Sequence, residues 1–153
     1  MDRDGRRMLA VAVRRDQACA VCLQGRKLKD WTVSHKAARS ADDALEVLGR
    51  WMAIYRPEIV ISQNPDSATR KSARNRAILR AIGRAIADED VLDLLVTRTF
   101  AYDNIYEEAV AIVARYPELR HKLPTKPKIW ETEPRRIIYF EALSLALHVL
   151  DGR

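Results

Sequence analysis

The pattern of apolar and polar residues in the first part of the chain predicts three β-strands joined by short turns. Each apolar run is compact and ends in polar residues, which is typical of an antiparallel meander. The runs cover residues 8–13, 18–23 and 28–34. The third run mixes polar and apolar residues and carries Lys29, which discourages edge-to-edge pairing, so we expect it at the edge of a sheet.

A fourth apolar run, Ile59-Val60-Ile61, is the central strand of the predicted sheet. Its three β-branched residues are typical of a strand buried on both faces, and Pro57 separates it from a preceding helical pattern. Because a helix joins this strand to the meander, we predict that it is parallel to the strand that begins near Leu9 and lies beside it. Ligands of such sheets gather at the C-terminal ends of the strands, so Gln63 lies where chemistry is expected.

Apolar residues recur at helical spacing on both sides of this strand. Ser40 is placed to cap the first helix with Asp43 at its third position, and a second helix begins between residues 67 and 72 and runs to Ala87. The predicted buried face of the first helix comprises Ala44, Leu45, Leu48, Met52 and Tyr55. That of the second comprises Ala77, Ile78, Ala81, Ile82, Ala85 and Ile86.

A fifth strand and a third helix follow. Residues 91–97 form a short apolar run, and Asn104 is placed to cap a helix with Glu107 at its third position. The apolar stripe of this helix comprises Ile105, Ala109, Ile112, Val113 and Tyr116. With the first four strands, these elements predict an α/β fold.

The last part of the chain is a basic, proline-rich loop and an apolar helix. The loop covers residues 117–134. Thr132 or Glu133 is expected to open the helix, with Pro134 in its first turn, where a missing N–H costs little. Residues 137–150 are apolar almost all round, which predicts deep burial.

Length and composition fit one globular domain. The chain has 153 residues, of which 48% are hydrophobic, and we treat 1–153 as a single domain with flexible ends at 1–7 and 151–153. No apolar stretch approaches the roughly 20 residues of a membrane span, and the start of the chain does not resemble a secretion signal. We therefore expect a cytoplasmic protein that does not associate with membranes.

The two cysteines, Cys19 and Cys22, lie within the second predicted strand. Residues three apart in a strand face opposite sides of the sheet, so we interpret them as two buried structural thiols. A redox pair of this spacing normally lies at the start of a helix, and a zinc site requires two further ligands. The sequence meets neither condition.

The net charge of +6 makes a polyanionic partner plausible, although a charge of this size also serves solubility. Arginines recur at every fourth position of the second helix, and acidic residues are nearly absent beside them, which strengthens the case for phosphate binding. A solvated charged face is the alternative of equal weight. The candidate nucleic-acid-binding residues on and before this helix are Arg70, Lys71, Arg74, Arg76, Arg80 and Arg84. Arg14 and Arg15 at the end of the first strand extend the set.

The basic loop supplies three further candidates. Lys126 and Lys128 are placed to hold a nucleic-acid backbone, and Trp130 to stack on a base. The alternative for the tryptophan is that it anchors the loop to the core.

The order of these elements resembles that of the ribonuclease H-like fold, and in detail the chain resembles the RuvC-type Holliday junction resolvases. The unit from Tyr55 to Gln63 is similar to the family's pattern of tyrosine, x, proline, x, valine, alanine, isoleucine, glutamate. The stretch Phe140–Leu147 is similar to the family's last helix, which is rich in aspartate, alanine and leucine. The resemblance implies a mixed five-stranded sheet of order 3-2-1-4-5, with strand 2 antiparallel and helices on both faces.

The resemblance also implies a reaction, but the chain departs from the residues that perform it. Family members hydrolyse phosphodiesters with carboxylates that hold two divalent metals, at the ends of the first and fourth strands and in the last helix. Here the first strand ends in Arg14 with Asp16 as the next acid, Gln63 replaces the glutamate, and Ile138 replaces one acid of the last helix. Glu141 is the one matched metal ligand.

We therefore expect a nucleic-acid-binding protein that lacks two-metal nuclease activity, with Glu141 paired to Arg14 or Arg15. One alternative is a structure-specific endonuclease that uses Mg²⁺ or Mn²⁺ held by displaced acids, and another is a protein-interaction scaffold. The acids available for displacement are Asp16, Asp66, Glu131 and Glu133. The resemblance favours DNA over RNA and a homodimer, because RuvC-type resolvases act as dimers.

Overall fold

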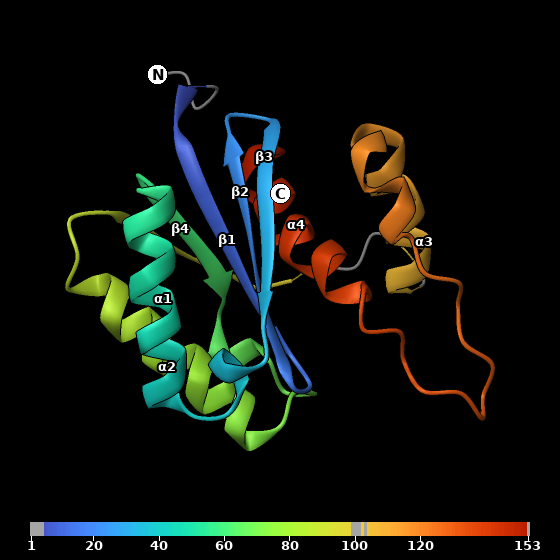
Figure 1. The fold of residues 1–153 in the computed structure, drawn as a ribbon, viewed down its shortest axis with the longest axis horizontal. Helices are drawn as coiled ribbons and strands as arrows, with labels where there is room; N and C mark the ends of the chain where they lie inside the picture. The colour runs from blue at the N-terminus through green and yellow to red at the C-terminus, as the bar shows by residue number, and fades with distance from the viewer. Residues whose placement is uncertain (1–4, 99–101, 103, 153) are drawn as a thin grey trace.

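The structure is a computed structural model that describes residues 5–98, 102 and 104–152, and its centre is a five-stranded sheet (Figure 1). The strands lie in the order β3-β2-β1-β4-β5. Strands β1 to β3 form the antiparallel meander, whereas β4 and β5 are parallel to β1. Their bounds are Arg7–Arg14 (β1), Gln17–Gln24 (β2), Lys27–Ser34 (β3), Ile59–Gln63 (β4) and Leu92–Val96 (β5). The α/β class and the strand order 3-2-1-4-5 are confirmed.

Strand β4 lies next to β1, as its β-branched composition and the connecting helix predicted. Leu9 is paired with Val60 and Val11 with Ser62 in a parallel register. Both strands run toward the bottom of Figure 1, so their C-terminal ends meet at one edge of the sheet. This edge is where the parallel strands of an α/β sheet usually present functional groups.

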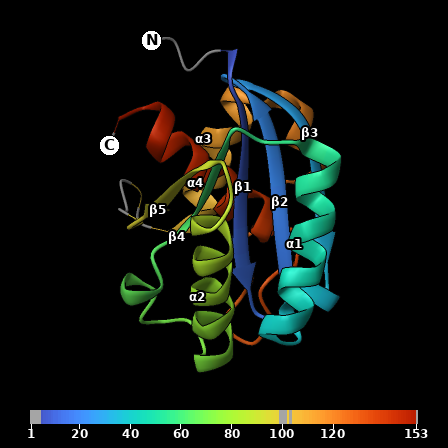
Figure 2. The same ribbon diagram turned by 90° about the vertical axis from the view of Figure 1, so that its left-hand side faces the viewer.

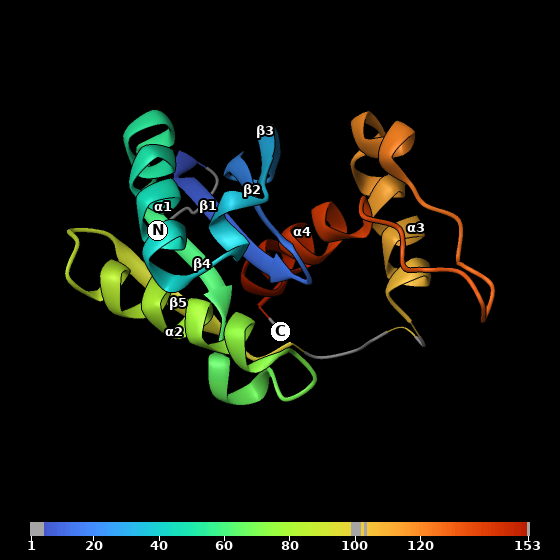
Figure 3. The same cartoon turned by 60° about the horizontal axis from the view of Figure 1, so that its bottom comes forward.

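Helices cover both faces of the sheet. Helices α1 and α2 lie on one face (Figure 2), and α4 lies on the other, between the sheet and α3 (Figure 3). The helices span Ala41–Tyr55 (α1), Ala73–Ala87 (α2), Ile105–Arg115 (α3) and Ile137–Leu150 (α4), and 3₁₀ helices span Lys36–Ala38 (η2), Pro65–Ser67 (η3) and Pro117–Lys122 (η4). Two separate hydrophobic cores result, one on each side of the sheet.

The helix caps follow the sequence pattern. The Ser40 hydroxyl accepts a hydrogen bond from the Asp43 backbone N–H, and the Asn104 side chain accepts from the N–H groups of Tyr106 and Glu107. Each cap satisfies backbone donors that the first helical turn leaves without a partner. The predicted starts of α1 and α3 are therefore confirmed.

The two cysteines face opposite sides of the sheet, as strand geometry predicted. Cys19 lies in the core beneath α4, and Cys22 lies in the core beneath α1 and α2. Neither forms a disulfide, and burial raises the pKa of both thiols. Both thiols therefore serve packing and stay protonated at neutral pH.

The predicted buried face of α1 is confirmed except at Leu45, because the other predicted residues are buried or half-buried against the core on this side of the sheet. Leu45 is exposed, whereas Val47 and Trp51 are buried. The buried positions follow 44, 47, 48 and 51, a narrower stripe that places the large Trp51 ring against the sheet.

The buried face of α2 is centred on its three predicted isoleucines and differs from the prediction only at its borders. Ala77 is exposed and Leu79 is buried, together with Asn75 in the first turn. Ala81 and Ala85 border the stripe and are half-buried.

The last helix begins later than predicted. It starts at Ile137, and neither Thr132, Glu133 nor Pro134 is helical. Glu133 is instead drawn into ion pairs with Arg14 and Arg15, which hold this segment away from the helix. At the chain ends, Arg7 belongs to β1 and Asp151 pairs with Arg26 and Arg115, while residues 1–4 and 153 lie outside the described residues.

Across the described ranges, none of the helices has both the length and the apolar character needed to cross a bilayer.

The central strand should dominate stability. Ile61 is fully buried in β4, so Ile61→Ala is expected to lower the free energy of unfolding by about 2–5 kcal/mol in chemical denaturation. The matched control is Ile54→Ala on α1, where the isoleucine is 69% exposed and the expected change is within about 0.5 kcal/mol. Similar values for the two variants would contradict the assigned burial of β4.

Candidate functional site

The candidate site is built around Glu141, a carboxylate inside the core. Glu141 lies on α4 and is 1% exposed, facing the C-terminal end of β1. One carboxylate oxygen, Oε1, accepts a hydrogen bond of 2.7 Å from Arg14, and the other, Oε2, accepts one of 2.8 Å from Lys71. Both oxygens are therefore bound by cationic side chains of this chain.

Arg14 reaches Glu141 because of the alternation of β1. Ala10 and Ala12 point into the core beneath α4, and Arg14 continues on the same face at the end of the strand. Its guanidinium also donates to both oxygens of Glu133, at 3.0 Å from Nε to each. Two carboxylates therefore share one guanidinium, the bidentate geometry that arginine suits best.

Lys71 enters the site from the turn that precedes α2. Its Nζ donates to the Val13 carbonyl oxygen at 2.7 Å and to Glu141, and its side chain is 14% exposed. The Lys71 ammonium thus binds both the end of β1 and Glu141, while Arg14 binds the other carboxylate oxygen of Glu141. Lys71 was predicted to bind nucleic acid, and the structure gives it an internal partner.

The cations around Glu141 keep it ionised. Burial alone disfavours its charge, but Lys71, Arg14 and Arg98 outweigh that effect and lower the pKa of Glu141 below its usual value. Burial likewise opposes the charge on Arg14, and Glu133 and Glu141 overcome it and raise the pKa of Arg14. Arg98 itself pairs with Glu108 at 2.6 Å.

The turn between β1 and β2 is held in an unusual conformation next to this network. Arg15 has a φ of 54°, which favours glycine, and its carbonyl oxygen accepts a hydrogen bond of 3.0 Å from the buried Asn75 side chain. Its Nε pairs with Glu133 at 3.0 Å. The contacts to Asn75 and Glu133 fix a strained residue at the edge of the sheet.

Two buried polar atoms at the end of β4 have no partner in the described part of the chain. Ser62 is fully buried on the α2 side, and its hydroxyl is unpaired, as is the side-chain carbonyl of Gln63 on the α4 side. Gln63 is 7% exposed and replaces the glutamate that the family resemblance implies. A neutral amide at this place adds no negative charge to the network.

The acids that were candidates for displaced metal ligands lie apart and have partners of their own. Asp16 pairs with Arg135 at 3.1 Å, Asp66 lies 3.7 Å from Arg80, and Glu131 accepts from the Lys128 backbone N–H. Among the described residues, no three His, Cys, Asp or Glu side chains gather where they could hold a metal ion. Because both oxygens of Glu141 are bound by cations, the donor set does not fit the two-metal centre of the resolvases.

The basic residues of α2 form a separate surface. Arg70, Arg74 and Arg84 are exposed, Arg80 pairs loosely with Asp66, and Arg76 is half-buried with its Nε unpartnered. No ion pair of Arg70, Arg74 or Arg84 occurs among the described residues. The structure therefore divides the predicted set. Arg14, Arg15 and Lys71 join the Glu141 network, whereas the arginines on and just before α2 are exposed, apart from the half-buried Arg76.

The loop before α4 carries its predicted residues outward, and it projects at the lower right of Figure 1. Trp130 is 80% exposed, and Lys126 and Lys128 are exposed beside it. The alternative that this tryptophan anchors the loop to the core is therefore wrong. The loop is anchored instead by the buried Leu119 at its start and by Glu133 at its end.

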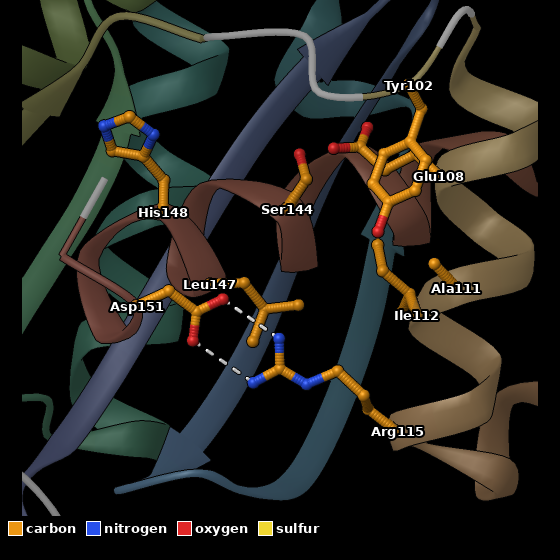
Figure 4. Close-up of a pocket in the computed structure, with 9 residues that line it drawn as sticks. All are labelled: Tyr102, Glu108, Ala111, Ile112, Arg115, Ser144, Leu147, His148 and Asp151. Atoms are coloured by element: carbon orange, nitrogen blue, oxygen red, sulfur yellow. Dashed lines mark hydrogen bonds and ion pairs between the residues drawn. The ribbon is translucent and has the colours of Figure 1, made fainter.

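A pocket that the sequence did not indicate lies between α3 and α4 (Figure 4). It encloses about 80 Å³, and several of its polar lining groups already have partners: Arg115 pairs with Asp151 at 3.0 Å, and the Ser144 hydroxyl donates to the Glu141 backbone carbonyl oxygen at 2.6 Å. Hydrogen bonds from Arg115 and Arg26 outweigh the opposing effect of burial and lower the pKa of Asp151 to about 2. The contacts of Asp151 attach α3 and the turn between β2 and β3 to the end of α4.

The charge of Glu141 gives a pH-dependent stability. Its pKa is depressed in the folded state, so its contribution is present above the unfolded value of about 4.3 and is lost as the pH falls through the folded value. Glu141→Gln leaves Lys71 without its buried counter-charge and Arg14 with Glu133 alone, and it is expected to cost about 3–5 kcal/mol at pH 7. The difference from the unmodified chain should narrow below about pH 4 in denaturation experiments.

The control for this experiment is Glu89→Gln, the same substitution at an exposed position. It should leave both the stability at pH 7 and its acid dependence close to those of the unmodified chain. A Glu141→Gln variant that behaves like this control would show that Glu141 is not ionised between the two cations.

Two comparisons with known proteins gave no match. No protein-family model matches the chain, and a search of curated proteins found no similar sequence. The resemblance to ribonuclease H-like resolvases therefore depends on the order of the elements and on the two local patterns around β4 and in α4.

Proposed function

We propose that this chain is a nucleic-acid-binding protein of the RuvC-type ribonuclease H-like fold in which two-metal nuclease chemistry has been lost. The sheet order β3-β2-β1-β4-β5, with β2 antiparallel to β1, supports the fold assignment. Fold alone does not fix function, so the proposal depends on the charges at the end of β1.

The single observation that carries the proposal is the pairing of Glu141 with Arg14 and Lys71. Glu141 is the matched position of the family's last helix, and its two oxygens contact a guanidinium and an ammonium at 2.7 and 2.8 Å. These groups supply positive charge at the place where the resolvases hold metal ions. A guanidinium or an ammonium has no open coordination position at which a water could be activated.

Binding would be carried by the exposed basic surface rather than by this internal network. Arg76, Arg80 and Arg84 repeat on one side of α2, and their guanidinium groups suit phosphate oxygens. A net charge of +6 adds a long-range attraction to any polyanion. DNA is the partner that the family resemblance favours.

The α2 surface predicts a defined salt dependence of binding. Replacing Arg76, Arg80 and Arg84 together by glutamine should weaken binding to any DNA sequence alike. The slope of log affinity against log salt should fall by about 2.7, because each lost phosphate contact contributes about 0.9. Fluorescence anisotropy with a labelled duplex between about 50 and 200 mM salt provides the measurement.

A triple variant of Lys27, Lys29 and Arg50 is the matched control. All three are exposed on β3 and α1, so their replacement by glutamine removes the same charge elsewhere on the surface. Equal slopes for the two triple variants would mean that net charge alone attracts DNA and that α2 is not the binding face.

We predict that the protein does not cleave nucleic acid, because cationic side chains of the chain already bind Glu141. Purified protein with branched, duplex and single-stranded DNA and RNA should give no turnover in Mg²⁺ or in Mn²⁺, because both oxygens of Glu141 are bound by cations. Glu141→Gln, checked for folding by circular dichroism, is the control. Cleavage that disappears in this folded variant would refute the prediction and restore the endonuclease alternative, with Asp16 and Asp66 as the next residues to replace.

A further inference from the structure

The loop before α4 ends in a turn that exposes two large apolar side chains. Ile129 is fully exposed and Trp130 is 80% exposed, which makes them the most exposed large hydrophobic residues in the described part of the chain. Burying these two apolar side chains would be favourable, but the turn leaves both in contact with water. Exposed apolar groups gathered at one place usually mark a contact with a partner.

Two hydrogen bonds between Lys128 and Glu131, here called the clamp, hold the ends of the turn together. The Glu131 backbone N–H donates to the Lys128 carbonyl oxygen at 2.9 Å, and the Glu131 carboxylate accepts from the Lys128 N–H at 2.9 Å. These two hydrogen bonds close the ends of a four-residue turn in which Ile129 and Trp130 are the central residues. A turn held in this way loses little further conformational freedom when it binds.

The surroundings of the turn are basic. Residues 117–136 contain six lysines and arginines against three glutamates. Glu131 is used in the clamp, and Glu133 is bound by Arg14 and Arg15. Lys128 places its Nζ 5.4 Å from the centre of the Trp130 ring, a cation–π contact that covers one face of the ring at most.

The turn also stands close to the C-terminal edge of β1. Trp130 is three residues from Glu133, so its Cα lies within about 11 Å of a residue that is bound to Arg14 and Arg15. The apolar tip therefore lies near the segment that Arg14 and Arg15 attach to the end of β1.

We propose that Ile129 and Trp130 form a base-stacking tip that recognises DNA with unstacked bases, such as single strands, in preference to continuous duplex. This inference rests on the proposed function and specifies its substrate. The indole stacks on a base through the face that Lys128 does not cover, and Ile129 packs beside it. In a continuous duplex, neighbouring base pairs already occupy the faces of each base, so the tip has no stacking partner without unstacking them.

The test compares a labelled thymidine 20-mer with closed circular duplex DNA, which has no free ends. Trp130→Ala should weaken binding of the 20-mer by about 5- to 150-fold, and affinity for the circle should change less than about twofold. Ile54→Ala, which removes an exposed isoleucine on α1, is the control and should change neither.

The clamp gives an independent test with charge held constant. Glu131→Ala and Glu131→Gln remove the same negative charge, but only glutamine retains an oxygen that can accept from the Lys128 N–H. Binding of the 20-mer should therefore be weaker for the alanine variant than for the glutamine variant. Equal affinities would overturn the role of the preformed turn.

The outcomes separate this inference from the proposed function. If the unmodified protein binds both DNAs and Trp130→Ala has no effect, or affects both equally, the stacking tip is refuted and nucleic-acid binding stands. If the unmodified protein binds neither DNA, the proposed function and the inference fail together. A third outcome would assign the tip to a membrane surface instead. In that case vesicles of anionic phosphatidylglycerol would shift the tryptophan fluorescence emission of the protein to shorter wavelength, and Trp130→Phe would abolish this shift.

Discussion

The structure depends on the neutralisation of one buried carboxylate. Glu141 is fully buried in a largely apolar helix next to the end of β1, where an unpaired charge is strongly unfavourable. Arg14 from β1 and Lys71 from the turn before α2 supply the two counter-charges, and Arg98 contributes through its field. Segments that are about 60 to 130 residues apart in sequence must therefore meet correctly before α4 can dock on the sheet.

This network also decides what chemistry the edge of the sheet can perform under the proposed function. Several carboxylates in one place attract divalent cations, whereas a carboxylate between a guanidinium and an ammonium does not. Gln63 at the end of β4 is neutral, and its side-chain carbonyl is buried without a partner in the described part of the chain. The charges at this edge of the sheet therefore favour cohesion between β1 and α4 over metal binding.

Much of the fold could be predicted because periodicity reports directly on burial. The β-branched run of β4, the polar residues of β3 and the spacing of Cys19 and Cys22 each define a strand position or face without reference to distant residues. The borders of the buried faces of α1 and α2 were predicted less well, because alanine and leucine occur all around both helices.

The candidate site was predictable in part, for a related reason. Glu141 was identifiable as a polar residue in an apolar helix, and such a residue requires a cation. Arg14 followed from the register of β1, but Lys71 precedes α2 within a basic stretch whose local pattern indicates solvent exposure. Its assignment to the core depends on the three-dimensional path of the turn between β4 and α2, which local sequence does not encode.

The same side chains cannot serve both the internal network and a nucleic-acid backbone. A phosphate that approached Arg14 or Lys71 would have to displace a buried carboxylate, and one that approached Arg15 would compete with Glu133. Arg70, Arg74 and Arg84 are exposed and would meet no such competition from the described residues. Arg14 and Arg15, at the end of β1, therefore have a structural role. They join the sheet to α4 and to the segment that carries the Trp130 turn. Helix α2 and that turn keep their exposed basic and apolar side chains outside this network, so changing them leaves the contacts between β1 and α4 in place.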